Sequence, residues 1–156
     1  MKTELILVGK TNDKHFQTGI DDYCQRIGHY MPFSITVIPE LKNTKSLSFQ
    51  QQKEREGELI LAKLQSSDHV VLLDEHGKDF RSVEFARWIE QKNASVRRLV
   101  FVIGGPYGFS ETVYSRANEK ISLSKMTFSH QMLRLVFVEQ IYRACTIIKG
   151  EPYHHE

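Results

Sequence analysis

Short apolar runs alternate with longer amphipathic segments along the chain. The runs at residues 5–8, 33–38, 69–73 and 99–103 are rich in Val, Ile and Leu and predict strands. They show little alternation of apolar and polar residues, which is typical of parallel strands buried on both faces. Because helical segments separate them, the pattern predicts an α/β fold with a mainly parallel sheet flanked by helices.

Apolar residues recur at helical spacing between these strands. From about residue 14 to 27 they share one face, and Gly28 ends that helix after a cap among residues 9–13. A second helix is expected at residues 49–64, weakened by Gly57 in its middle. The remaining expected elements are a helix capped by Ser82, a short helix near residues 111–116 and a short strand at residues 121–123.

The last predicted helix is apolar on two sides. It begins at a cap on Ser129 and continues to about Lys149, with Gly150 as its stop. One side would bury against the sheet, and a chain of 156 residues has little left to cover the other. The pattern therefore predicts a homodimer built on this helix. One apolar stripe contains Leu133, Phe137, Ile141, Ala144 and Ile148, and the other contains Leu135, Val138, Tyr142 and Cys145.

Two charged residues of this helix allow two interpretations. Glu139 lies four residues before Arg143, an order and spacing that favour an ion pair within the helix. Arg143 could instead contact an RNA phosphate or base.

Composition is that of an ordinary globular protein. Hydrophobic residues make up 40% and charged residues 26% of the 156 residues, which suits a single domain spanning residues 1–156. The net charge of +2 is too small to indicate a nucleic-acid partner, so any RNA contact would depend on local patches. Cys24 and Cys145 form no C-x-x-C pair, and metal binding is not expected. Without a signal peptide or a run of ~20 apolar residues, we expect a cytoplasmic protein with no membrane segment.

Candidate chemistry lies in three loops at the expected carboxyl ends of the strands, where ligands bind in open α/β sheets. Their sequences are LLDEHGK, VIGGPYGF and SLSKMTF. Gly104, Gly105 and Gly108 would let the backbone approach a ligand closely, although the same glycines also suit a simple tight turn. The chain has no G-x-G-x-x-G, P-loop, G-x-S-x-G or H-E-x-x-H motif, which argues against dinucleotide-binding, hydrolase and metalloprotease functions.

Several longer motifs together resemble one family. They are the LILVGK opening, the KEREGE helix, VVLLDEHGK, FVIGGPYG, the LSKMTFSHQMLRLVFVEQIYRA block and the GEPYHHE tail. They are similar to the ribosomal RNA large subunit methyltransferase H family, of the SPOUT class of S-adenosylmethionine-dependent methyltransferases. The resemblance extends over essentially the whole chain. It implies a C-terminal trefoil knot, with the knot and the cofactor site within roughly residues 70–156.

The resemblance also implies an activity and a set of site residues. The family methylates N3 of a pseudouridine in 23S rRNA, within the assembled ribosome. The tail residues Tyr153 and His154, with Arg143 as a charge partner, are the catalytic candidates that it suggests. Positions that would bind S-adenosylmethionine by similarity are Leu73, Gly104, Leu123, Ser124, Lys125, Met126, Thr127 and Phe128.

Two positions depart from the family pattern, and two other functions compete with methyl transfer. Ser129 replaces a common Pro, which is tolerable at a helix start, and His155 replaces a common Lys or Arg, which weakens a tail contact to phosphate. One alternative is a ribosome assembly factor of the same fold that binds nucleotide or RNA without catalysis. The other is a flavodoxin-like or nicotinamide-dependent oxidoreductase, against which the missing G-x-G-x-x-G after the first strand already argues.

Overall fold

The fold is a parallel sheet covered by helices on both faces. A computed structural model describes residues 1–155, and within them five strands form one sheet in the order β2-β1-β4-β3-β5. All four strand pairs are parallel, which confirms the predicted class. The strands are β1 (Lys2–Val8), β2 (Phe33–Ile38), β3 (His69–Asp79), β4 (Arg98–Ile103) and β5 (Glu119–Ser122).

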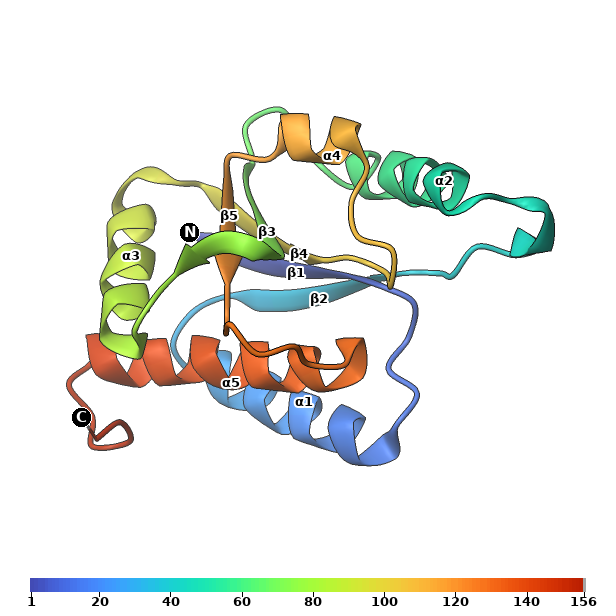
Figure 1. Cartoon of the computed structure of the whole chain (residues 1–156). Coiled ribbons are helices and arrows are strands. Elements are labelled where there is room, and N and C mark those ends of the chain that lie inside the picture. Colours follow the sequence, from blue (N-terminus) through green and yellow to red (C-terminus); the bar gives the residue numbers. More distant parts are fainter. Residues whose placement is uncertain (156) are drawn as a thin grey trace.

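Two helical layers enclose this sheet (Figure 1). One contains α1 (Lys14–Ile27), α3 (Ser82–Ser95) and α5 (His130–Ile148); the other contains α2 (Phe49–Leu61) and α4 (Glu111–Arg116). A short 3₁₀ helix, Thr44–Ser46, precedes α2.

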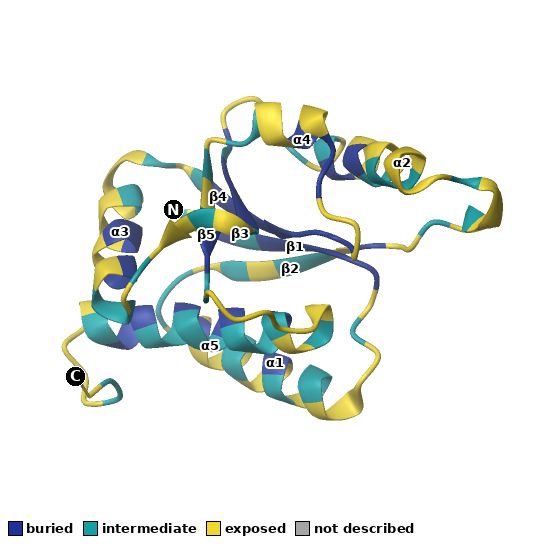
Figure 2. Ribbon diagram, viewed as in Figure 1, coloured by how far each residue is buried: buried dark blue, intermediate teal, exposed yellow. Residues whose placement is uncertain are grey.

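Alternate strand residues face these two layers, as the pleat of a strand requires. In β1, Leu5 and Leu7 pack in the core with α1, α3 and α5, whereas Ile6 and Val8 pack in the core with α2 and α4. Figure 2 shows buried residues along β1 and β4 in the middle of the sheet, whereas the edge strand β2 is only partly buried and the outer faces of the helices are exposed. Burial on both faces explains why β1, β4 and the first half of β3 read as apolar runs.

β3 extends beyond its predicted end at Leu73. Its last residues are polar, so apolar character does not predict them as strand. They form a strand because they pair with β5, where Lys78 pairs with Ile121. A Cβ atom added to Gly77 would lie only 2.6 Å from the backbone N and C atoms of Ile121. The two segments therefore touch through their main chains. The trefoil knot itself stays a prediction.

Other element boundaries also differ from the predictions. α2 ends at Leu61, three residues early, and the final strand covers residues 119–122 instead of 121–123. Ser82 is not the cap of α3: Arg81 occupies that position, and its N–H donates to Oε2 of Glu84 at 3.0 Å. The Ser82 hydroxyl points to α5 instead, where it donates to Oε1 of Gln140 at 2.9 Å.

α5 contacts both α1 and α3 as well as the core of the sheet. Leu135 of its second apolar stripe reaches Gly19 of α1, where an added Cβ would lie 2.8 Å from Cδ1 of the leucine. Tyr142 packs its ring 5.8 Å from that of Tyr23. The assumption that the chain cannot cover this second side is therefore wrong, because α1 covers much of it.

Candidate functional site

A cavity of about 780 Å³ opens beside the middle of β3, at the carboxyl ends of β4 and β5 and next to the first turn of α5. The three segments that the sequence singled out form it, although the first of them, expected as a loop, is part of β3. All ten predicted cofactor residues line this one cavity. They are Leu73, Gly104, Gly105, Gly108, Leu123, Ser124, Lys125, Met126, Thr127 and Phe128.

Side chains on Gly104 and Gly105, in the loop after β4, would press against neighbouring side chains. A Cβ atom on Gly104 would lie 2.9 Å from the ring of Phe109, and one on Gly105 would lie 2.6 Å from a carboxylate oxygen of Glu56. Gly108 has a φ of +82°, which favours glycine, and its N–H donates to the carbonyl of Gly105 at 3.2 Å. Both interpretations of the glycines hold together, because the loop is a tight turn and also lines the cavity.

Glu56 supports this loop from α2. Burial raises the pKa of its carboxyl above the ordinary value, a hydrogen bond from the backbone of Gly105 lowers it, and the charge of Glu40 raises it further. The net direction is upward. A side chain of α2 is thus held against the floor of the cavity, which connects this helix to the site.

Residues 123–128 form the opposite wall and lead into α5. Their path is fixed by short local hydrogen bonds: the Ser122 hydroxyl donates to the carbonyl of Ser124 at 3.0 Å, and the Met126 N–H donates to the Ser124 hydroxyl at 2.9 Å. Ser129 then caps α5, as predicted, by accepting from the Met132 N–H at 3.2 Å. The Met126 side chain is 77% exposed, so this wall presents apolar surface to the opening.

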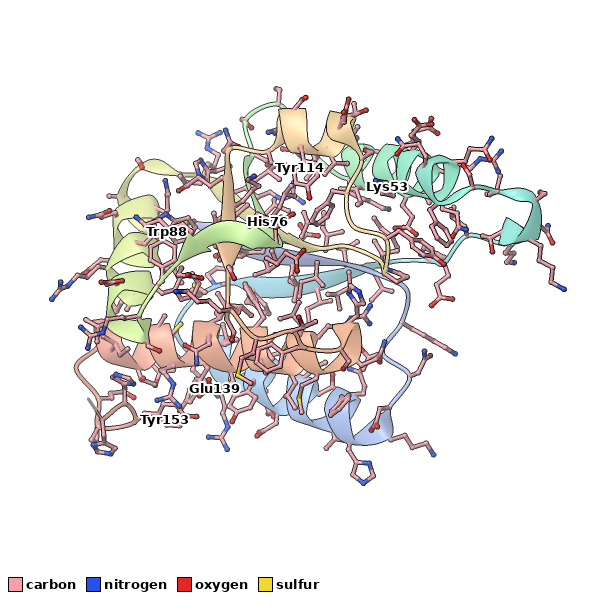
Figure 3. All side chains as sticks on the ribbon, viewed as in Figure 1. Lys53, His76, Trp88, Tyr114, Glu139 and Tyr153 are labelled. Atoms are coloured by element: carbon pink, nitrogen blue, oxygen red, sulfur yellow. The ribbon has the colours of Figure 1, made fainter. Side chains whose placement is uncertain are left out.

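The cavity also contains titratable residues that the sequence prediction missed. Asp74, His76, Tyr114 and Lys53 all line it, and the last three are labelled in Figure 3. The Tyr114 hydroxyl donates to Oδ2 of Asp74, and burial, with that hydrogen bond, raises the pKa of the tyrosine to about 12. Tyr114 therefore stays protonated and acts as a donor. Asp74 and His76 could have been predicted, because they belong to the DEHGK sequence of a candidate segment. Lys53 and Tyr114 could not, because helical spacing alone does not show that they reach the cavity.

The three catalytic candidates lie elsewhere. Arg143 donates to Oε1 of Glu139 through Nη2 at 2.6 Å and through Nε at 3.1 Å, and its Nη1 lies 3.0 Å from Nδ1 of His154. The Tyr153 hydroxyl donates to the same Glu139 oxygen at 3.0 Å. We call these four residues the C-terminal cluster. The ion-pair interpretation of Glu139 and Arg143 is confirmed.

The C-terminal cluster does not line the cavity of its own chain. Figure 3 shows Tyr153 beyond the C-terminal end of α5, away from Lys53 and Tyr114. Within one chain, the catalytic candidates that the resemblance suggests therefore do not meet the predicted cofactor residues. Burial and its hydrogen bonds to Tyr23 and Glu139 raise the Tyr153 pKa, so this phenol keeps its proton at neutral pH.

Residues 1–155 contain neither a membrane-spanning helix nor a group of metal ligands. No helix there is long and apolar enough to cross a membrane. In the same residues, no three His, Cys, Asp or Glu side chains are grouped so that they could hold a metal ion.

Comparison with known proteins identifies the family. The family model described as "Predicted SPOUT methyltransferase" matches residues 1–154. The chain belongs to this SPOUT methyltransferase family. Full-length relatives named "Ribosomal RNA large subunit methyltransferase H" include those of Bacteroides fragilis, at 67% identity, Phocaeicola vulgatus, at 65%, and Flavobacterium johnsoniae, at 57%. Each alignment covers 100% of both chains. The resemblance found in the sequence is thus confirmed, and the cavity is the candidate cofactor site of a SPOUT methyltransferase.

Proposed function

We propose that this protein is an S-adenosylmethionine-dependent methyltransferase that modifies N3 of a pseudouridine in 23S rRNA, within the assembled ribosome. Relatives that carry the rRNA methyltransferase name match the chain from end to end, at up to 67% identity. The observation that carries the proposal is the convergence of all ten predicted cofactor positions on one cavity. Activity on ribosomes implies a cytoplasmic protein. The same names favour the enzyme over the assembly-factor and oxidoreductase alternatives.

The cavity fits S-adenosylmethionine in size and in the character of its walls. Its volume of about 780 Å³ lies within the range typical of small-molecule sites. Apolar side chains suit the adenine, and backbone groups of the glycine loop and of residues 123–128 suit its polar atoms. Because Gly104 and Gly105 carry no side chain, their main chain can come close to the ligand.

S-adenosylmethionine supplies an electrophilic methyl group, so the protein has to align the pseudouridine ring with it and manage the N3 proton. We infer that the C-terminal cluster serves the second task as a charge partner. Arg143 stays cationic, because its hydrogen bond to Glu139 raises its pKa. His154 receives a hydrogen bond from Arg143 at Nδ1, so that nitrogen is not available as a base in this arrangement. Donors that stabilise negative charge on the ring fit this geometry better than a free imidazole base.

This role requires a second copy of the chain, because the C-terminal cluster lies away from its own cavity. We propose a homodimer in which the cluster of one copy approaches the cavity of the other. Apolar residues that α1 leaves uncovered are available for such an interface on α5: Met132 is 36% exposed and Ile148 is 37% exposed. A dimer would also enlarge the RNA-facing surface of a chain whose net charge is only +2.

Mixing two inactive variants tests this arrangement. Gly104→Val forces a side chain against the Phe109 ring in the wall of the cavity and leaves the tail intact, whereas Arg143→Met removes the charge partner and leaves the cavity intact. If the two parts act across the dimer, each variant alone is inactive on ribosomes and their mixture regains activity. Inactive mixtures that still exchange subunits would reject the arrangement. A monomer at micromolar concentration with full activity would reject the dimer itself.

A further inference from the structure

Two exposed aromatic rings lie stacked at the rim of the cavity. Phe49, in the first turn of α2, and Tyr107, in the glycine loop, have ring centroids 4.2 Å apart and an interplanar angle of 18°. Phe49 is 63% exposed and Tyr107 is 40% exposed. One face of each ring is used in the pair, so the remaining surface offers a flat apolar platform to a third ring.

The platform belongs to the rim of the candidate site. Tyr107 lines the cavity directly. Lys53 follows Phe49 by one helical turn, so it projects from the same side of α2, and it also lines the cavity. A positive charge therefore lies beside the aromatic pair at the opening. Exposed aromatic faces next to a cation are the combination that unstacked nucleotides bind, with the base on a ring and the phosphate near the charge.

We propose that the Phe49–Tyr107 platform stacks against a nucleobase that flanks the target nucleotide, with Lys53 near an adjoining phosphate. This inference rests on the proposed function, since it assigns the platform to the RNA substrate of the same site. Stacking tolerates any base identity, so the platform positions the strand and holds the target nucleotide at the cavity. Phe49 and Tyr107 are thus positioning residues and take no part in the methyl transfer.

Other roles for the Phe49–Tyr107 pair predict different results. If the stack only fastened the glycine loop to α2, its loss would disturb Gly104 and Gly105 and weaken cofactor binding. If the platform bound a ribosomal protein through apolar contact alone, leucine would replace phenylalanine without loss. Stacking on a base requires an aromatic ring and leaves the cofactor site unchanged.

The test compares Phe49→Leu, Phe49→Trp and wild type, with Leu59→Ala as the control. Leu59 is on the same helix, is 40% exposed and has no part in the cavity. The assays are steady-state methylation of ribosomes that lack the modification, S-adenosylmethionine affinity by calorimetry, and thermal unfolding. For Phe49→Leu we expect KM for ribosomes to rise about 10-fold, with cofactor affinity and melting temperature unchanged. Phe49→Trp and Leu59→Ala should keep the wild-type KM.

Lys53→Gln gives an independent readout. Removing one phosphate contact should lower the slope of log KM against log salt concentration by about 1. Three results would each overturn the proposed role of the platform. They are an unchanged KM in Phe49→Leu, equal effects of leucine and tryptophan at position 49, and a loss of cofactor affinity that accompanies the rise in KM. Wild type that binds S-adenosylmethionine and methylates no ribosome would instead reject the proposed function, and the platform with it.

Discussion

Gly77 lies where the end of β3 passes directly over the backbone of β5, and alanine at this position would collide with main-chain atoms. The added Cβ would be 2.6 Å from the backbone N and C atoms of Ile121 and 2.7 Å from its Cα. Ordinary contacts begin at 3.4 Å, so the two segments would have to separate by about 0.8 Å. No side-chain rotation can relieve this contact, because all three atoms belong to the backbone.

The cost follows from what such a separation disturbs. Ile121 is 2% exposed, pairs with both Leu73 and Lys78, and lines the cavity. Overpacking in a well-packed core typically costs up to about 3 kcal/mol, and a rigid backbone neighbour favours the upper end. For a domain of this size, that corresponds to a fall in melting temperature of about 6–12 °C. Because Ile121 lines the cavity, cofactor affinity should fall as well.

Gly105→Ala is the matched control. Its Cβ would approach a carboxylate oxygen of Glu56 at 2.6 Å, but this atom is the end of a flexible side chain that can move aside. We expect Gly105→Ala to melt within a few degrees of wild type. Urea denaturation and calorimetric titration with S-adenosylmethionine measure both variants. A Gly77→Ala protein with wild-type stability and affinity would refute the close main-chain contact between β3 and β5.

Three other predictions concern single side chains. Ser129→Ala should lower the free energy of unfolding by about 1 kcal/mol through loss of the α5 cap, as measured by urea denaturation, while Ser129→Asp should restore it. Tyr114→Phe removes the donor to Asp74 and should weaken S-adenosylmethionine binding about tenfold in a calorimetric titration; unchanged affinity would exclude this pair from the site. Burial would raise the pKa of Glu119, but hydrogen bonds from Lys92, His69 and Trp88 outweigh it and lower the pKa below 4.5. The ionised Glu119 therefore stabilises the fold above pH 4.5, and this contribution is lost as the pH falls below 4.5. The free energy of unfolding of Glu119→Gln, measured by urea denaturation, should change less than that of wild type as the pH is lowered below 4.5.

The sequence predicted the sheet and the location of the cavity well, for physical reasons. Strands buried on both faces must be apolar, so β1, β4 and the first half of β3 were visible as short runs, whereas the edge strand β2 was visible from its β-branched residues. Parallel strands place their carboxyl ends at one edge, so the segments after residues 73, 103 and 122 had to converge, although the first of them continues as strand β3. The glycines of the second loop then marked the place where no side chain fits.

What the sequence could not predict depended on contacts between distant segments. The end of β3 is polar, and only its partner β5 makes it a strand. The second apolar side of α5 seemed to require another subunit, but α1 packs against it through Gly19 and Tyr23. The candidates Arg143 and His154 do lie in contact in the structure, and their catalytic role stays a prediction. Periodicity and spacing carried no information on how far this pair lies from the cavity.

Methyl transfer from labelled S-adenosylmethionine, with mapping of the product nucleoside, tests the proposed function most directly. Assembled ribosomes that lack the modification are compared with their free 23S rRNA, and Gly104→Val, whose side chain would press against Phe109 in the cavity wall, is the control. We expect label in N3-methylpseudouridine from assembled ribosomes with wild type, and none with the variant. Demonstrable cofactor binding without label in either substrate would contradict the proposed function.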